Sequence, residues 1–266
     1  MTGAAVTAPG PAGDLGLGGA AVIVTGASSG IGAATAAELG VAGASVVLVG
    51  RREEALKAHA DLVVEAGGQA LSVPADMAEP DSPARIAAAC RERFGRIDGV
   101  VNNAAVVQHR PLQDWDTAEF DRHVAANVRG PYFLIQAALP DLLASPIRSV
   151  VNISSSSGTL HLAGQSIYGM TKAALNYLTI SLAGELAPSG IRVNCIGPGP
   201  VDTPIHRTYS DDIEATYRWL AEQVPLGRIG VAGEVARWIT FLLSPISSFM
   251  TGAVIPLDGG QVIHRV

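Results

Sequence analysis

The feature that most constrains the fold of this chain is a glycine-rich turn between a short apolar run and a helical stretch. Residues 20–25 are apolar and largely β-branched, which is typical of a buried strand. The turn that follows, residues 26–32, reads GASSGIG, and an alanine-rich stretch continues to about residue 43. Glycine lets a backbone turn tightly and approach a pyrophosphate, and a helix start offers free N–H groups. The sequence therefore predicts a strand–turn–helix unit that binds a dinucleotide.

Beyond this unit, short apolar segments alternate with longer amphipathic stretches. Strands are predicted near residues 20–25, 45–49, 69–73, 97–101, 148–153, 191–196 and 253–257. Helices are predicted near residues 30–43, 52–66, 80–94, 117–144, 166–187 and 231–244. Such alternation favours right-handed crossovers between parallel strands. We expect an α/β, Rossmann-type doubly wound fold, with a seven-stranded parallel sheet, helices on both faces and the ligand at the carboxyl ends of the strands.

The composition suits one globular domain after a short leading segment. Of the 266 residues, 48% are hydrophobic and 16% are charged, which is ample for a core that covers both sheet faces. No linker-like stretch divides the interior, so residues 19–266 are predicted to form a single domain. Residues 1–18 are mainly Gly, Ala, Pro and Thr and lack the basic start and apolar centre of a signal peptide. We expect them to form a flexible tail.

Charge and cysteine content exclude several classes of partner. A formal net charge of −6 argues against a nucleic-acid surface or an anionic membrane. No apolar run approaches the roughly 18 residues needed to span a bilayer. Cys90 and Cys195 are the only cysteines, so no disulfide framework is expected and a cytoplasmic location is predicted. No residue spacing suggests a metal site, and the expected partner is a small molecule.

The residues best suited to chemistry are Tyr168 and Lys172, four apart in a predicted helix. Residues i and i+4 share a helix face, so the phenol and the ammonium would point into the same space. A free tyrosine has a pKa near ~10, too high for ready proton exchange at neutral pH. A nearby positive charge would lower that pKa and make Tyr168 a general acid or base. Ordinary helices also contain such pairs, so the assignment depends on the rest of the chain.

Together with the glycine turn, this pair resembles the short-chain dehydrogenase/reductase family, whose other motifs follow in the same order. They are Asn102-Asn103-Ala104-Ala105, Asn127 in Asn-Val-Arg-Gly, Ser155 thirteen residues before Tyr168, Pro198-Gly199, and the segments 225–228 (PLGR) and 257–260 (LDGG). The resemblance covers roughly residues 15–260. It implies hydride transfer between a nicotinamide cofactor and a carbonyl or alcohol carbon.

The resemblance implies a catalytic set of Asn127, Ser155, Tyr168 and Lys172. Tyr168 would protonate the developing alkoxide, and Lys172 would lower the tyrosine pKa and bind the nicotinamide ribose. Ser155 would hydrogen-bond the substrate oxygen where negative charge accumulates. Asn127 would hold a water that passes protons to Lys172, although by itself it equally suits a helix kink. The other serines of the run 154–157 are chemically equivalent to Ser155, and only family spacing selects among them.

The resemblance also implies a set of cofactor-binding positions. They are Gly26, Ser28, Ser29, Gly30, Ile31, Gly32, Arg51, Arg52, Asp76, Met77, Asn103, Ala104, Ala105, Tyr168, Lys172, Pro198, Gly199, Val201 and Thr203. Asp76 would accept a hydrogen bond from the adenine amino group, and Val201 and Thr203 would hold the nicotinamide carboxamide. Ala105 stands where the family usually has glycine.

Cofactor preference depends on the segment Gly50-Arg51-Arg52 at the end of the second predicted strand. NAD-specific relatives usually carry an acid there for the ribose hydroxyls. This chain has Gly50 at that position, and a guanidinium next to it can grip the extra phosphate of NADP with two hydrogen bonds. The sequence therefore predicts NADP(H) over NAD(H). The alternative is that both arginines merely open a solvated helix.

Residues 203–226 break the alternation and are predicted to cap the substrate site, with a surface helical pair as the alternative. The residues expected to line the pocket are Gln108, His109, His161, Leu162, Gln165 and the aromatic residues Tyr209, Tyr217 and Trp219. They form no cluster of positive charge, so a neutral, partly apolar carbonyl compound is the expected substrate.

The leading function is thus an NADP(H)-dependent ketone reductase or secondary-alcohol dehydrogenase. The alternatives are a cofactor-binding sensor or scaffold without turnover, and a carbon–carbon double-bond reductase of the same fold, whose related enoyl reductases space Tyr and Lys more widely. The family implies a homotetramer, or a homodimer, built on the helices 117–144 and 166–187. Small residues permit close approach there: Ala125, Ala126, Ala137, Ala138, Ala173, Ala174 and Ala183.

Overall fold

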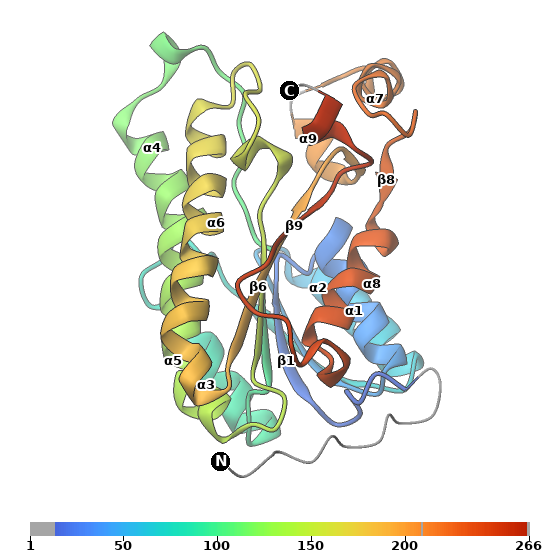
Figure 1. Ribbon diagram of the computed structural model, residues 1–266. Helices are drawn as coiled ribbons and strands as arrows, with labels where there is room; N and C mark the ends of the chain where they lie inside the picture. The colour runs from blue at the N-terminus through green and yellow to red at the C-terminus, as the bar shows by residue number, and fades with distance from the viewer. Residues whose placement is uncertain (1–13, 209, 265–266) are drawn as a thin grey trace.

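The computed structural model describes residues 14–208 and 210–264, and it confirms the predicted parallel sheet (Figure 1). Seven parallel strands pair in the order β3-β2-β1-β4-β5-β6-β9. In chain order they are β1 Ala21–Thr25, β2 Ser45–Gly50, β3 Gln69–Pro74, β4 Gly99–Asn102, β5 Ser149–Ile153, β6 Arg192–Pro198 and β9 Val254–Leu257. Each strand overlaps its predicted range.

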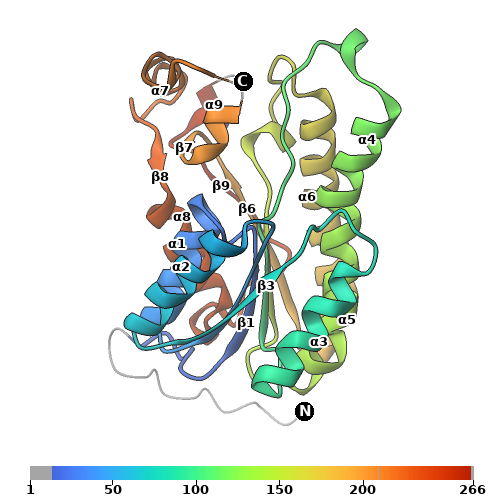
Figure 2. The same ribbon diagram turned by 180° about the vertical axis from the view of Figure 1, so that it is seen from behind.

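Helices cover both faces of the sheet, as Figures 1 and 2 show from opposite sides. One face carries α1 Gly30–Val41, α2 Glu53–Glu65 and α8 Ala232–Leu243. The other carries α3 Ser82–Phe94, α4 Thr117–Val124, α5 Gly130–Ala144 and α6 Ser166–Leu186. Beyond the carboxyl ends of the central strands lie α7 Ile213–Glu222, α9 Gln261–His264 and the short pair β7 Val201–Asp202 and β8 Gly230–Val231. None of the helices in the described part of the chain has the length and apolar character required to cross a membrane.

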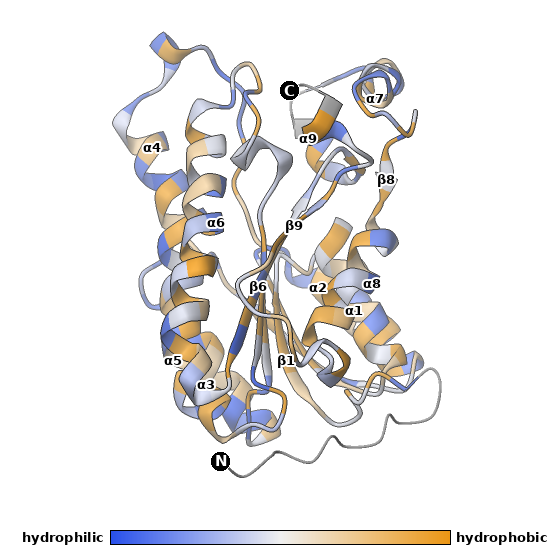
Figure 3. Cartoon of the chain, in the orientation of Figure 1, coloured by the Kyte–Doolittle hydropathy of each residue, from blue (hydrophilic) through white to orange (hydrophobic). Residues whose placement is uncertain are grey.

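The core has two halves because successive side chains of a strand point to opposite faces. On β1, Val22 and Val24 join the apolar cluster beneath α1 and α8, whereas Ala21 and Ile23 join the cluster beneath α3 and α5. In Figure 3 hydrophobic colour covers much of the central sheet and parts of the helices on both of its faces. Burial on both faces explains why the strands read as continuous apolar runs.

The direction of strand order changes between β1 and β4, and a polar latch joins these strands at their carboxyl ends. Asn103 Nδ2 donates to Thr25 O at 2.9 Å, and Thr25 Oγ1 accepts from the N–H groups of Asn103 and Ala104, each at 3.0 Å. In doubly wound sheets this change of direction opens a crevice for ligands. The latch therefore fixes the two loops that border the crevice.

The predicted helix 117–144 is interrupted. A π-helical segment, Ala125–Arg129, separates α4 from α5, and Gly130 N–H donates to the carbonyl of Ala125, five residues back. Pro131 has no N–H to offer the carbonyl of Asn127, which prevents a regular α-helical bond there. Single π turns of this kind are often found at functional sites.

The packed part of the chain begins before residue 19. Residues 1–13 of the predicted tail lie outside the described residues, but Leu17 is fully buried. The carbonyl of Leu15 accepts a hydrogen bond from Ser244 Oγ at 2.6 Å. Residues 14–18 are therefore anchored on the core, because an apolar side chain and a backbone acceptor both find partners there.

Candidate active site

Two adjoining cavities open at the carboxyl ends of the strands. One, of about 610 Å³, is bounded by the glycine turn, the ends of β2 and β3 and the segment after β4, and we call it the glycine-lined cavity. The other, of about 670 Å³, is bounded by the segments after β5 and β6, the start of α6, and α7, and we call it the serine-lined cavity. Their walls share Ile31, Asn103, Ala105, Val107, Thr203 and Ile205. A ligand lying in one can therefore extend into the other.

The glycine turn has no room for side chains. A Cβ on Gly32 would overlap the carbonyl oxygen of Gly26, and a Cβ on Gly26 would lie 2.7 Å from Asn103 Nδ2. Gly26 and Gly30 also have positive φ angles, +69° and +57°, which other residues adopt only with strain. The helix cap at Ser29 makes no side-chain hydrogen bond, so the first N–H groups of α1 face the cavity without that partner. This cradle fits the pyrophosphate of a dinucleotide.

The far end of the glycine-lined cavity is positively charged. Its charged wall residues are Arg51, Arg52, Arg122 and Asp76, three positive charges against one negative. Arg52 Nη2 donates to Ser28 O at 3.1 Å, and Arg122 Nη2 lies 3.0 Å from Asp76 Oδ2. Burial opposes ionisation of Asp76, but its bonds from the Ala78 N–H and Arg122 outweigh burial and hold the pKa of Asp76 below its ordinary value. Asp76 is therefore a charged acceptor, with Met77 beside it in the same wall.

Gly50 lies against this charged end. A Cβ at Gly50 would come within 3.3 Å of the Ser28 side chain, tighter than ordinary packing. A side chain at this position would therefore require a small shift of the Ser28 side chain. The structure thus leaves the arginines without a competing carboxylate at the end of β2.

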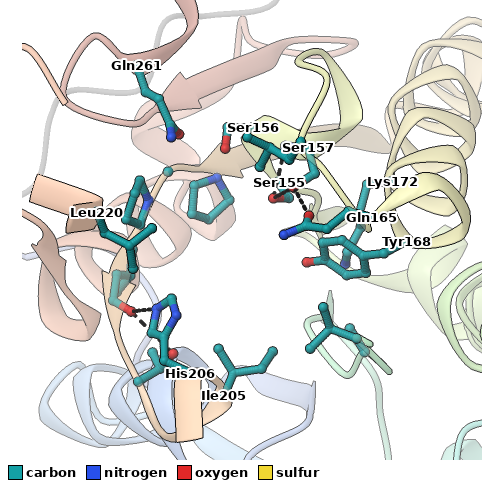
Figure 4. Close-up of a pocket in the computed structure, with 18 of the residues that line it drawn as sticks. Ser155, Ser156, Ser157, Gln165, Tyr168, Lys172, Ile205, His206, Leu220 and Gln261 are labelled. Carbon is teal, nitrogen blue, oxygen red and sulfur yellow. Dashed lines mark hydrogen bonds between the residues drawn. The ribbon is translucent and has the colours of Figure 1, made fainter. Parts of the chain in front are cut away.

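Tyr168 and Lys172 lie together on α6 and face the serine-lined cavity (Figure 4). Lys172 is only 2% exposed, its Nζ donates to Ile153 O at 2.7 Å, and Nζ lies 5.5 Å from the centre of the Tyr168 ring. The predicted convergence of the phenol and the ammonium is thus present. Burial lowers the pKa of Lys172 to about 8.

The pKa of Tyr168 moves in the opposite direction to the sequence-based expectation. Burial raises it to about 12, and the Ser155 hydroxyl only partly opposes that rise. The expectation fails because burial disfavours the charged phenolate more strongly than the neighbouring groups favour it. Tyr168 is consequently held as a neutral phenol at neutral pH, which is the protonated form that a proton donor requires.

The structure separates the serines that the sequence left equivalent. Ser154 is buried, and its Oγ donates to Lys172 O at 3.0 Å, so its hydroxyl hydrogen is already engaged. Ser155 lies on the wall beside Tyr168, and its Oγ donates to Ser157 Oγ at 3.1 Å. Ser157 Oγ in turn donates to Gln165 Oε1 at 2.6 Å. Of these serines, Ser155 is the one whose hydroxyl acts on the Tyr168 pKa.

Asn127 lines neither cavity. Its Oδ1 accepts from Val106 N at 2.8 Å, and its Nδ2 donates to Val106 O at 2.9 Å and to Thr171 Oγ1 at 3.0 Å. Thr171 Oγ1 in turn donates to Tyr168 O at 2.8 Å. The π segment thus ties the loop after β4 to the helix turn that carries the tyrosine.

The predicted pocket residues fall into different places. His109, His161, Leu162, Gln165 and Trp219 line the serine-lined cavity. Gln108 lines the glycine-lined cavity instead, Tyr217 donates to Asp202 Oδ1 at 2.6 Å outside both walls, and Tyr209 lies outside the described residues. The remaining predicted cofactor positions all line one or other cavity, apart from Gly32 at the base of the cradle.

Sequence reasoning missed the wall opposite the tyrosine. Ile205, His206 and Leu220 form it, and Gln261 reaches in from α9, as Figure 4 shows. Gln261 is 2% exposed, and no group in the described chain pairs with its Oε1. These residues come from segments without a repeating pattern, and only the position of Gln261 directly after LDGG marked it in the sequence. Within residues 14–208 and 210–264, no cluster of His, Cys and acidic residues could hold a metal ion.

Comparison with known proteins identifies this arrangement. Residues 26–261 match the family model described as enoyl-(acyl carrier protein) reductase. The chain is 38% identical over 239 residues to cis-4-hydroxycyclohexanecarboxylate dehydrogenase of Sinomonas cyclohexanicum, covering 90% of this chain and 94% of that protein.

Two solved structures share the fold over nearly their whole length. A short-chain type dehydrogenase/reductase from Mycobacterium marinum is 34% identical with a TM-score of 0.85, covering 92% of this chain and 96% of that one. L-sorbose reductase from Gluconobacter frateurii, complexed with NADPH and L-sorbose, is 28% identical with a TM-score of 0.87, covering 94% of this chain and 98% of that one. The chain therefore belongs to the short-chain dehydrogenase/reductase family and is an oxidoreductase of alcohol and carbonyl groups.

Proposed function

We propose that this protein is an NADP(H)-dependent oxidoreductase that interconverts a ketone and a secondary alcohol, with Tyr168 as the proton donor in reduction. The observation that carries the proposal is the pairing of a neutral phenol with the Ser155 hydroxyl on the wall of the serine-lined cavity. That wall adjoins the glycine cradle through shared residues.

Bound NADPH would supply the hydride to the carbonyl carbon. The chain's own residues deal with the oxygen. Tyr168 gives its phenolic proton to the oxygen as negative charge develops, and Ser155 donates a hydrogen bond to the same atom. Lys172 lies close enough to stabilise the phenolate that remains until solvent returns a proton. One hydride and one proton are added, which balances a carbonyl against a secondary alcohol.

The preference for NADP(H) is supported by charge. The end of the glycine-lined cavity carries Arg51, Arg52 and Arg122 against a single carboxylate. An additional phosphate would be attracted there, and guanidinium groups bind phosphate in a bidentate manner. The NADPH bound by L-sorbose reductase, a structural relative, agrees with this preference.

The description of the matching family model favours a second candidate, reduction of a carbon–carbon double bond. The sequence argues for the carbonyl, since enoyl reductases space their Tyr and Lys more widely than Tyr168 and Lys172, which are four positions apart. A sensor without turnover is disfavoured, since it needs no proton donor next to its ligand.

The substrate is proposed to be neutral and partly apolar. Among the described residues, the wall of the serine-lined cavity has no Arg, Asp or Glu, and its one lysine, Lys172, already donates to Ile153. Leu162, Ile205 and Leu220 supply apolar surface. Residues 203–226 would form a cap within one domain of residues 19–266, since Thr203, Thr216 and several neighbours line the cavity.

A panel of neutral ketones and secondary alcohols tests the proposal. We expect ketones to oxidise NADPH, which is measured as a loss of absorbance of the reduced nicotinamide. NADH should be the poorer hydride donor. If the cofactor binds but no ketone or alcohol in a broad panel changes its oxidation state, the result contradicts the proposal and supports a cofactor-binding sensor without turnover.

We further propose a homotetramer, or a homodimer, in a reducing cytoplasm, where the buried cysteines Cys90 and Cys195 stay free. The sequence predicted that small residues on the helices 117–144 and 166–187 would permit close approach between chains. That prediction is wrong for Ala125, Ala126, Ala138 and Ala183, which are already buried within a single chain.

The outer face of α5 and α6 supports assembly instead. Tyr132 and Phe133 on α5 are 42% and 45% exposed, and Tyr177 and Ile180 on α6 are 73% and 53% exposed. Apolar side chains gathered on neighbouring helices are typical of a covered interface. Light scattering with size exclusion should show several chains of 27.3 kDa together. Tyr177→Asp should dissociate them, whereas Leu62→Asp on the exposed side of α2 should not.

A further inference from the structure

Four side chains form a continuous hydrogen-bonded row from the cavity wall to the loop after β4 (Figure 4 shows its serine and glutamine members). Ser155 Oγ contacts Ser157 Oγ at 3.1 Å, Ser157 Oγ contacts Gln165 Oε1 at 2.6 Å, and Gln165 Nε2 contacts His109 Nε2 at 3.1 Å. We call these four residues the relay. Its members come from the segment after β5, the residue before α6, and the loop after β4.

The chemistry of the groups fixes the direction of these bonds. Gln165 Oε1 can only accept, so Ser157 must spend its single hydroxyl hydrogen on it. Ser157 then has no hydrogen for Ser155, so Ser155 must be the donor in the contact between them. In this direction the relay draws the Ser155 hydrogen away from the substrate oxygen.

The hydrogen bonds of the relay can also take the opposite donor-to-acceptor direction. If the Gln165 carboxamide turns over, its NH₂ donates to Ser157, and Ser157 can donate to Ser155 Oγ. Ser155 is then left with its own hydrogen for the substrate. The reversal needs an N–H at His109 Nε2 to meet the carboxamide oxygen, which one tautomer of a neutral imidazole provides.

We propose that Gln165 is a positioning residue for carbonyl reduction: seated on His109, its carboxamide sets through Ser157 the direction in which the Ser155 hydroxyl donates. This rests on the proposed function, in which Ser155 donates to the developing alkoxide. Substrate binding favours the reversed relay, because negative charge on the oxygen attracts the hydrogen. Gln165 touches neither the reacting carbon nor the transferred proton in this account.

Two substitutions act on the relay in different ways. Gln165→Leu removes the partner of Ser157, and kcat for reduction should fall about tenfold, the loss of one positioned hydrogen bond. Gln165→Glu introduces a group that only accepts, which locks the unproductive direction, and kcat should fall about 10–100-fold at neutral pH. Cofactor affinity should stay within about twofold, because Gln165 does not line the glycine-lined cavity. Gln113→Leu and Gln113→Glu, on an exposed turn, are the matched controls and should leave kcat unchanged.

Lowering the pH distinguishes an effect of Gln165→Glu on the direction of the hydrogen bonds from a general disturbance of the structure. Once protonated, the introduced carboxyl can donate to Ser157, so kcat of Gln165→Glu relative to the parent should recover as pH falls. The titratable groups that face this position are His109 from the loop after β4, His206 from across the cavity, and Tyr168 and Lys172 from α6. They are present in both proteins, but the introduced carboxylate would raise the pKa of His109, so the same ratio is also measured with His109→Ala in both proteins. A ratio that stays constant with pH contradicts the proposal.

A double-mutant cycle that combines Gln165→Leu with Ser157→Ala tests whether Gln165 acts on Ser155 through Ser157. If Gln165 acts through Ser157, adding Gln165→Leu to Ser157→Ala should cost less than twofold further. Fully additive losses would overturn the relay, provided that thermal unfolding shows all variants folded. Ser155→Ala distinguishes the two proposals: if it retains parental kcat, the catalytic assignment itself fails. If it is inactive while Gln165 and Ser157 are additive, only the relay fails.

Discussion

The two cavities are adjacent but are built by different means. The glycine-lined cavity depends on backbone: glycines that leave no space for a Cβ, free N–H groups at a helix start, and a charged end with three arginines. The serine-lined cavity depends on hydroxyl, carboxamide and imidazole side chains from several separate segments, and its described lining residues include no arginine or acid. We propose that the first holds the nicotinamide cofactor and that the second accommodates the substrate.

The electrostatics differ in the same way. In the glycine-lined cavity, burial of Asp76 is outweighed by the Ala78 N–H and by nearby arginines, which hold the Asp76 pKa below its ordinary value. In the serine-lined cavity burial prevails, so the Tyr168 pKa is raised to about 12 and the Lys172 pKa is lowered to about 8. Binding a polyanion and moving one proton thus call for opposite environments, and each cavity should fail separately.

The largest effect should come from Tyr168→Phe. Turnover should fall by ~10²–10⁴-fold, because the ring still fills its place but the proton donor is gone. NADPH affinity should remain within about threefold of the parent in a fluorescence titration, because the glycine cradle is untouched. A variant that turns over within threefold of the parent contradicts the role of Tyr168.

Gly32→Ala should show the converse pattern. The new Cβ would overlap the Gly26 carbonyl, so the turn must open and NADPH affinity should weaken by about 10²-fold, the scale of a misplacement of about 1 Å. Gly233→Ala on α8 is the matched control, because a Cβ there meets nothing within 4 Å. Calorimetric titration of both variants would decide it. Equal affinities would mean that the cradle does not hold the cofactor.

Arg51→Asp should reverse the cofactor preference. The substitution removes a favourable contact with the extra phosphate of NADPH and adds a repulsive charge. The ratio of NADPH affinity to NADH affinity should therefore fall by about 10–100-fold. Arg85→Asp on α3, which lines neither cavity, serves as the charge-matched control. A parent that already prefers NADH would show that the Gly50-Arg51 pattern was misread.

The smallest effect should appear in the pH dependence of reduction. Burial lowers the Lys172 pKa to about 8, so kcat should be level below that pH and decline above it, approaching about tenfold per unit as the ammonium is lost. Titration of Lys172 would not itself unfold the chain in this range, and thermal unfolding measured at each pH separates loss of the fold from loss of kcat. Between about 8 and 10.5 the unfolded chain binds more protons at this lysine than the folded chain, so this group's contribution to stability rises with pH. A profile level to pH 10 would remove Lys172 from the proton chemistry.

The sequence predicted the cofactor side better than the substrate side. The strands, the glycine turn and the charged segment after β2 are local patterns, in which period and residue type determine structure directly. Gln261 and His206 reach the cavity only through tertiary placement, and no local pattern could report that.

The structure differs from the sequence-based prediction at two further points, the pKa of Tyr168 and the continuity of the helix 117–144. The direction of the Tyr168 pKa shift could not be predicted, because it depends on how completely burial outweighs the neighbouring charge. The break in the helix 117–144 was readable in principle from Pro131, which cannot donate to Asn127, but helical periodicity on both sides concealed it.

The most direct test of the central claim uses NADPH carrying deuterium at the transferable position and a cyclic α,β-unsaturated ketone as substrate. The account predicts an allylic alcohol with one deuterium on the carbinol carbon, an oxygen-bound proton from water, and no product with Tyr168→Phe. A saturated ketone with deuterium on the carbon β to the carbonyl would contradict it, and would show that the protein reduces carbon–carbon double bonds instead.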